Sequence, residues 1–222
     1  MRYRRVFNFA AAGLFLALVA GTALLAKREI FVATTAPLWD SAWILQNPEG
    51  LQPAYSISAN TEAIAGCLRV VNGAESLFLP QNMRFGVVRS CRALARDITA
   101  ASEDNAYAWF ALAKFAQILG QTAMFNHALE RAYATGPTEQ WIAEQRVELA
   151  EEALETLSSR ALSGHKKDLA LLVRSPRGIR AIARRYLRDA GFRDRITQVV
   201  EALSADDQVR FVSLIRLEAR QP

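Results

Sequence analysis

The feature that constrains this chain most is an uncharged stretch near its N-terminus. The 21 residues from Val6 to Ala26 carry no charged side chain. A helix of about 20 residues crosses a hydrocarbon layer of about 30 Å, and it satisfies its own backbone hydrogen bonds there. A cleaved signal peptide is the competing interpretation, but its apolar core is shorter, roughly 7–15 residues. We therefore expect an uncleaved transmembrane signal anchor over residues 6–26.

The charges that flank this stretch predict its orientation. Three arginines precede it, whereas one lysine and one arginine follow it directly. Positive charge favours the cytoplasmic side of a membrane. We therefore expect residues 1–5 in the cytoplasm and the rest of the chain outside, which in a Gram-negative bacterium is the periplasm. The expected location is the bacterial inner membrane, with a single span and a periplasmic C-terminal domain.

The two cysteines bear on this orientation. Cys67 and Cys91 each share one face of a predicted helix with aliphatic residues. One interpretation is a pair of buried thiols, since free cysteine is among the most buried residue types. In an oxidising compartment the same pair is expected to form a disulfide.

The remaining sequence predicts an all-α fold. Alanine, leucine, arginine and glutamate dominate it, and alternating β-branched runs are absent. After a juxtamembrane segment at 27–58, we expect a degenerate helical-repeat domain at 59–163 and a basic helical region at 164–222. The fold class is thus an N-terminal transmembrane helix followed by an array of helical hairpins. The expected helices are 59–72, 82–101, 104–119, 122–135, 138–162, 166–174, 176–190, 193–203 and 205–219.

One hairpin carries a recognisable spacing of large and small residues. Within a 34-residue unit numbered from Ala106, the marked positions are Trp109, Leu112, Ala113, Gly120, Leu129, Ala132 and Pro137. This spacing resembles the tetratricopeptide repeat. Only one good copy is visible, and a single repeat cannot bury its own faces, so we expect a short degenerate array.

The resemblance also implies a partner-binding surface. In tetratricopeptide repeats the first helix of each unit lines a concave, peptide-binding face. By position, Tyr107, Phe110, Lys114 and Gln117 would face that groove. The alternative is that Phe110 belongs to the core and Lys114 is only solvated.

A narrower resemblance lies at the end of this hairpin. The residues that carry it are Ala132, Gly136, Pro137, Glu139, Ile142 and Arg146. This stretch is similar to that of the VpsP-like group, single-span proteins associated with bacterial surface-polysaccharide biosynthesis and export. It implies an accessory or scaffold role beside polymerases or exporters, with envelope or membrane proteins as partners.

Charge is segregated in the C-terminal half. Six glutamates and one arginine lie within 139–155, and eight arginines and two aspartates lie within 174–195. A ridge of arginines runs at helical spacing: Arg177, Arg180, Arg184 and Arg188. The ridge either pairs with the acidic helix or docks an anionic lipid headgroup, an acidic protein or an acidic glycan. Nucleic acid is not expected, because contact with it would require the inverted topology.

The sequence shows no catalytic signature. It lacks the GxSxG, HExxH, P-loop and GxGxxG motifs, and its two histidines and two cysteines form no metal-binding spacing. We therefore expect no catalytic residue, no metal, no cofactor and no enzyme. The expected function is a membrane-anchored interaction or scaffold protein. The alternative is a structural subunit of a membrane complex that packs through small residues of its span, Ala10 to Gly13 and Gly21.

Overall fold

The computed structural model describes residues 2–35 and 41–220, and every regular element in these ranges is a helix. This confirms the expected all-α class. The chain divides into two compact units, Met1–Ser90 and Cys91–Pro222. The boundary falls within α5 (Gln81–Ala101).

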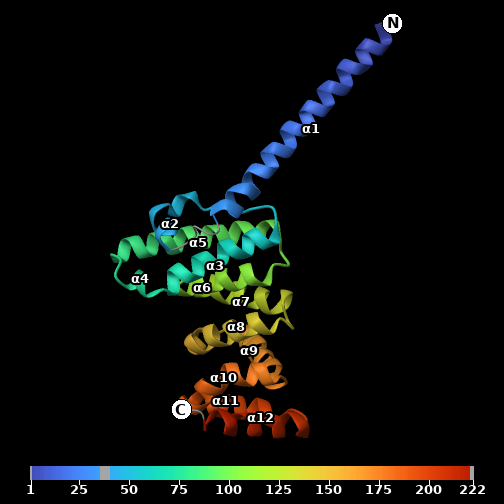
Figure 1. The fold of residues 1–222 in the computed structure, drawn as a ribbon. Coiled ribbons are helices and arrows are strands. Elements are labelled where there is room, and N and C mark those ends of the chain that lie inside the picture. The colour runs from blue at the N-terminus through green and yellow to red at the C-terminus, as the bar shows by residue number, and fades with distance from the viewer. Residues whose placement is uncertain (1, 36–40, 221–222) are drawn as a thin grey trace. The chain divides into compact units, whose positions relative to one another are not determined.

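Unit 1 begins with the long helix α1 (Arg2–Thr35), drawn in blue in Figure 1. The shorter elements that follow are α2 (Ser41–Gln46), η2 (Pro48–Gly50), α3 (Ile57–Asn72) and α4 (Ala74–Leu77). Glu29 of α1 holds the start of α3, because its carboxylate accepts hydrogen bonds from the backbone N–H (2.7 Å) and hydroxyl (2.8 Å) of Ser56. These bonds lower the pKa of Glu29 below its ordinary value.

The middle of α1 presents apolar side chains to its surroundings. Leu14, Phe15, Leu16, Leu18, Leu24 and Leu25 are all more than half exposed. Residues 36–40 of the expected juxtamembrane segment lie outside the described part of the chain, as do the side chains of the first ten residues.

Among the described residues, no helix has the length and apolar character of a membrane span.

Both cysteines are fully buried. Cys67 of α3 and Cys91 of α5 lie at disulfide distance, and neither thiol is free. The expected pairing of the two cysteines is therefore present in the structure.

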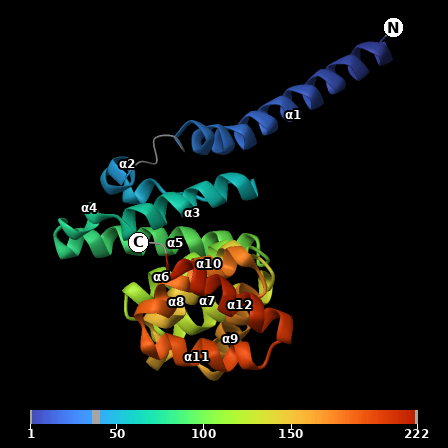
Figure 2. The ribbon, with the colours of Figure 1, turned by 60° about the horizontal axis from the view of Figure 1, so that its bottom comes forward.

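Unit 2 is a stack of helical hairpins that descends from green to red in Figure 1. Its helices after α5 are α6 (Ala106–Ile118), α7 (Thr122–Thr135), α8 (Gln140–Glu152), α9 (Ser159–Val173), α10 (Pro176–Arg188), α11 (Ala190–Glu201) and α12 (Ala205–Glu218). The pairs α6–α7, α8–α9 and α10–α11 pack together, and α12 packs on α10 and α11. We call α6, α8, α10 and α12 the A helices, which contact one another in series, and α7, α9 and α11 the B helices, which do the same. In Figure 2 these helices overlap in projection.

The first hairpin follows from local signals. The side chain of Asn105 accepts a hydrogen bond from the Ala108 N–H and so begins α6. Gly120 turns the chain with a φ of 68°, a conformation that favours glycine. A methyl group at Gly136 would come within 2.6 Å of the Ala106 Cβ, so α7 closes against the start of α6 only with glycine there. The predicted helix 122–135 is confirmed.

The predicted single helix at 138–162 is wrong, because the chain breaks within this range. The chain forms α8, then the short turn η3 (Leu154–Thr156), and then α9. Ser158 starts α9, because its hydroxyl accepts from the Ala161 N–H while its own N–H donates to Asn126 Oδ1. The predicted helix at 166–174 is therefore the second half of α9.

Helices α10, α11 and α12 pack with α8 and α9 around one apolar core. Ser175, Asp189 and Ser204 cap the starts of α10, α11 and α12 with their side chains. The buried residues that these helices share with α8 and α9 are Ala143, Val147, Leu169, Leu172, Val173, Ile179, Ile182, Ala183, Phe192, Ile196, Val200, Phe211 and Ile215. The arginines of α10 thus lie opposite a fully packed apolar stripe.

Candidate functional site

The first A helix, α6, carries aromatic and polar side chains at the positions predicted to line a groove. Tyr107 of α6 stacks on Phe110 at 6.1 Å between ring centroids. Phe110 is only 5% exposed, so it supports Tyr107 from below instead of forming the surface. Lys114 and Gln117, one and two turns further on, are half-buried.

The second A helix carries the acidic residues. Glu148 and Glu152 of α8 are exposed, and Glu144 is half-buried. Trp141, at the start of the helix, is 41% exposed. Helix α8 begins 34 residues after α6, so Trp141 occupies the position on α8 that Tyr107 occupies on α6.

The third A helix carries the arginine ridge. Arg177, Arg180, Arg184 and Arg188 of α10 are all exposed. Arg180, Arg184 and Arg188 form no ion pair with any described residue. Like charges one turn apart on a helix repel each other. Arg180, Arg184 and Arg188 therefore form a positive surface whose charge no described acidic residue compensates.

Contacts between neighbouring A helices place these three sets on one surface. The Tyr107 ring lies 4.9 Å from the Trp141 ring. Lys114 Nζ lies 2.7 Å from Glu152 Oε2, and Arg177 Nε lies 3.3 Å from Glu144 Oε1. We call this surface, formed by the exposed and half-buried side chains of α6, α8 and α10, the A-helix face. Of the predicted groove residues, Tyr107 and Lys114 make these contacts, whereas Phe110 is buried beneath the surface. The predicted arginine ridge contributes to the surface from α10.

A buried ionic network lies behind this face, and sequence reasoning did not anticipate it. Arg146 of α8 is completely buried, and its guanidinium donates two hydrogen bonds of 2.8 Å to the carboxylate of Asp168. It also donates to the carbonyl oxygens of Ala132 (2.8 Å) and Gly136 (3.0 Å). One side chain thus ties the end of α7 to both helices of the next hairpin. The sequence signal was an arginine on the apolar stripe of an otherwise acidic helix.

A second buried cluster lies one turn further along α8. The carboxylate of Glu151 bonds to His165 Nε2 at 2.7 Å and pairs with Arg195 of α11. Arg185 of α10 lies 4.0 Å away. Glu151 therefore links the second hairpin to the third.

Burial and hydrogen bonding act in opposite directions on these acids. Burial alone would raise the pKa of Glu151, but hydrogen bonds from His165 and Arg195 outweigh it and hold the pKa below its ordinary value. Burial raises the pKa of Asp168, and the hydrogen bonds from Arg146 limit that rise.

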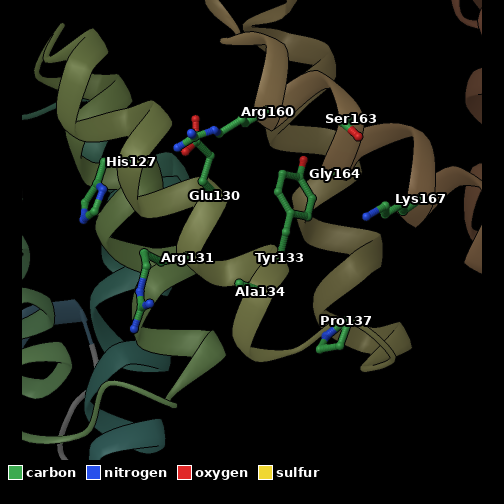
Figure 3. Close-up of a pocket in the computed structure, with 10 residues that line it drawn as sticks. All are labelled: His127, Glu130, Arg131, Tyr133, Ala134, Pro137, Arg160, Ser163, Gly164 and Lys167. Atoms are coloured by element: carbon green, nitrogen blue, oxygen red, sulfur yellow. The ribbon is translucent and has the colours of Figure 1, made fainter.

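A hollow of about 630 Å³ lies between α7 and α9 on the B-helix side. Figure 3 shows that the Tyr133 side chain of α7 points toward Gly164 of α9, and both residues line this hollow. A methyl group at Gly164 would come within 2.3 Å of the Tyr133 ring, so the glycine makes room for the ring. The ring also lies 5.1 Å from the Arg146 guanidinium. Burial raises the pKa of Tyr133, and its hydroxyl has no hydrogen-bond partner among the described residues.

The described residues contain no group of three histidine, cysteine or acidic side chains that could hold a metal ion. No protein-family model, curated protein or solved structure matches this chain.

Proposed function

We propose that this protein is a non-enzymatic, membrane-anchored interaction protein whose A-helix face docks a protein partner. One observation carries the proposal. Tyr107 and Lys114 of α6 and the arginines of α10 follow from two unrelated sequence patterns. Contacts between adjacent A helices nevertheless join them into one surface. The exposed, unpaired arginines give that surface a charge that a partner can complement.

Tetratricopeptide-like repeats are the proposed type of hairpin. Helices α6 and α8 begin 34 residues apart, which is the length of that repeat. Three stacked hairpins also meet the requirement that repeats bury one another's faces. The proposed place of action, beside envelope polysaccharide biosynthesis or export, rests on the short VpsP-like stretch alone.

Helix α1 is the proposed anchor, with residues 6–26 in the inner membrane and the domain in the periplasm. Support comes from the exposed leucines of α1 and from the cysteine pair, since disulfides persist in oxidising compartments. Expressed in full, the chain should stay with membranes through alkaline carbonate washing. Its thiols should react with a maleimide reagent only after reduction and denaturation. Release by carbonate, or labelling without reductant, would contradict the anchor or the exported topology respectively.

The face is tested by charge reversal. With the double substitution Arg180→Glu and Arg184→Glu, partner proteins should no longer co-purify from mild-detergent extracts, because the charge of the arginine ridge is reversed at two positions. Lys166→Glu with Lys167→Glu makes the same change in charge on exposed residues of the B helix α9 and should leave them bound. Equal loss from both variants would contradict a docking role for this face.

A structural subunit that packs through α1 is the second candidate. Gly13 and Gly21 of α1 have no neighbouring atom within 4 Å of where a Cβ would stand. Small residues allow membrane helices to approach closely. In that case the partners should remain bound when Arg180 and Arg184 are reversed, and should be lost when Gly13 and Gly21 are replaced by leucine.

A further inference from the structure

A hollow of about 250 Å³ lies between the acidic and the basic helix on the A-helix face. The lining includes Val147 of α8 and Ile182 of α10, which are buried and apolar. Glu144, Glu148 and Arg185 also line it. The hollow thus combines an apolar floor with charged edges.

Two of these three charges already have partners. Glu144 pairs with Arg177, and Arg185 pairs with Glu151 and Asp189. Glu148 is exposed and forms no ion pair with any described residue. The hollow therefore offers one free carboxylate, which suits a lysine or arginine whose aliphatic stem covers the apolar floor.

The surroundings of the hollow differ on its two sides. Toward α6 lie the rings of Tyr107 and Trp141, in contact with each other. On α10 lie Arg180, Arg184 and Arg188, without carboxylate partners in the described part of the chain. A path that runs along α8 from Trp141 to Glu148 and then across to α10 therefore meets an aromatic platform, then a free carboxylate, then a row of free guanidinium groups.

We propose that the A-helix face binds an extended protein segment that carries an aromatic or large aliphatic residue, a basic residue and an acidic residue, in that spatial order. This proposal rests on the docking role proposed above and names the chemistry of the partner. Trp141 and Glu148 are seven residues apart on α8, or about 10 Å at 1.5 Å per residue. Packed helices lie 8–10 Å apart. An extended chain spans about 3.3 Å per residue, so the three side chains should be spaced about three positions apart.

The mixed charge of the face favours a protein segment over a polyanion. An anionic membrane or glycan would gain from the arginines of α10 but would bring negative charge against exposed Glu148 and Glu152. A segment with alternating charges satisfies both helices.

The test uses the full chain in mild detergent and fluorescent peptides in an anisotropy titration. The peptides carry aromatic, lysine and glutamate positions three residues apart, in both chain directions. Companion peptides exchange the lysine and glutamate or scramble the order. We expect one direction to bind at least about tenfold more tightly than the exchanged and scrambled peptides, which corresponds to about 1.4 kcal/mol.

Matched variants separate this proposal from the docking role itself. Glu148→Lys should weaken binding of the preferred peptide about tenfold and improve binding of the peptide whose lysine is replaced by glutamate. Lys166→Glu on α9 should change neither. If Arg184→Glu weakens binding but Glu148→Lys does not, the charge order is wrong and the docking face stands. If neither variant changes the binding of any peptide, both proposals fail. Tightest binding to an all-glutamate peptide or to heparin would assign the face to a polyanion and overturn the inference.

Discussion

Replacing Arg146 with alanine should lower the free energy of unfolding by about 3–5 kcal/mol, because it leaves a buried carboxylate without its counter-charge. The Asp168 side chain is only 3% exposed and receives two hydrogen bonds from Arg146. The carbonyls of Ala132 and Gly136 would lose a donor as well. Urea unfolding of the full chain in mild detergent, followed by far-ultraviolet circular dichroism, measures the change.

A paired substitution distinguishes the ion pair from simple loss of packing. In the first hairpin, apolar Leu112 lies 34 residues before Arg146, the same distance that separates the starts of α6 and α8. Arg146→Leu with Asp168→Ala replaces the pair with apolar residues and should recover most of the lost stability, since apolar replacements of a buried pair are often neutral. Arg96→Ala, which breaks the exposed Arg96–Asp97 pair, should cost about 0–1 kcal/mol. A loss for Arg146→Ala no larger than that for Arg96→Ala would show that the network contributes little.

Replacing Gly178 with alanine should lower the free energy of unfolding by about 1–3 kcal/mol through overpacking. A Cβ at this position would come within 2.3 Å of the Leu172 carbonyl oxygen and 2.7 Å of the Leu172 Cα. These are backbone atoms, so no side-chain rotation relieves the clash. Because Gly178 lies between Arg177 and Arg180, the variant should also displace the arginine ridge.

The control for this prediction is another helical glycine. Gly86 of α5 has no atom within 4 Å of the place where a methyl group would stand, so Gly86→Ala should raise stability by about 0.5–1 kcal/mol. The same urea titration compares the two. If Gly178→Ala also stabilises the protein, the start of α10 does not lie as close to the end of α9 as the structure places it.

Local signals explain which helices could be predicted. Helix α7 is bracketed by Gly120 and by Gly136–Pro137, and both of its ends were predicted correctly. The α8–α9 boundary has no such marker. The expected break lay between 162 and 166, around Gly164, yet Gly164 lies inside α9, where it makes room for Tyr133. The glycine serves tertiary packing, which no local pattern reveals.

The candidate site was also predictable where local sequence signals decide and unpredictable where tertiary packing does. Helical spacing identified the exposed arginines, because an amphipathic stripe is a property of one helix. The neighbours of each side chain depend on how hairpins stack. Pairing of the ridge with the acidic helix was one of the two expected alternatives, and Arg177 pairs with Glu144 in this way. The Tyr107–Trp141 contact and the burial of Glu151 emerged only from the fold.

The most direct test of a docking role for the A-helix face is photo-crosslinking in intact cells. A photoreactive amino acid is placed at Glu148 or Arg184 on the A-helix face, or at Lys166 on α9, in the full-length chain. We predict crosslinks to the same partner protein from Glu148 and Arg184, and none from Lys166. Crosslinks from Lys166 alone, or equal crosslinks from all three positions, would contradict the assignment of the A-helix face as the docking surface.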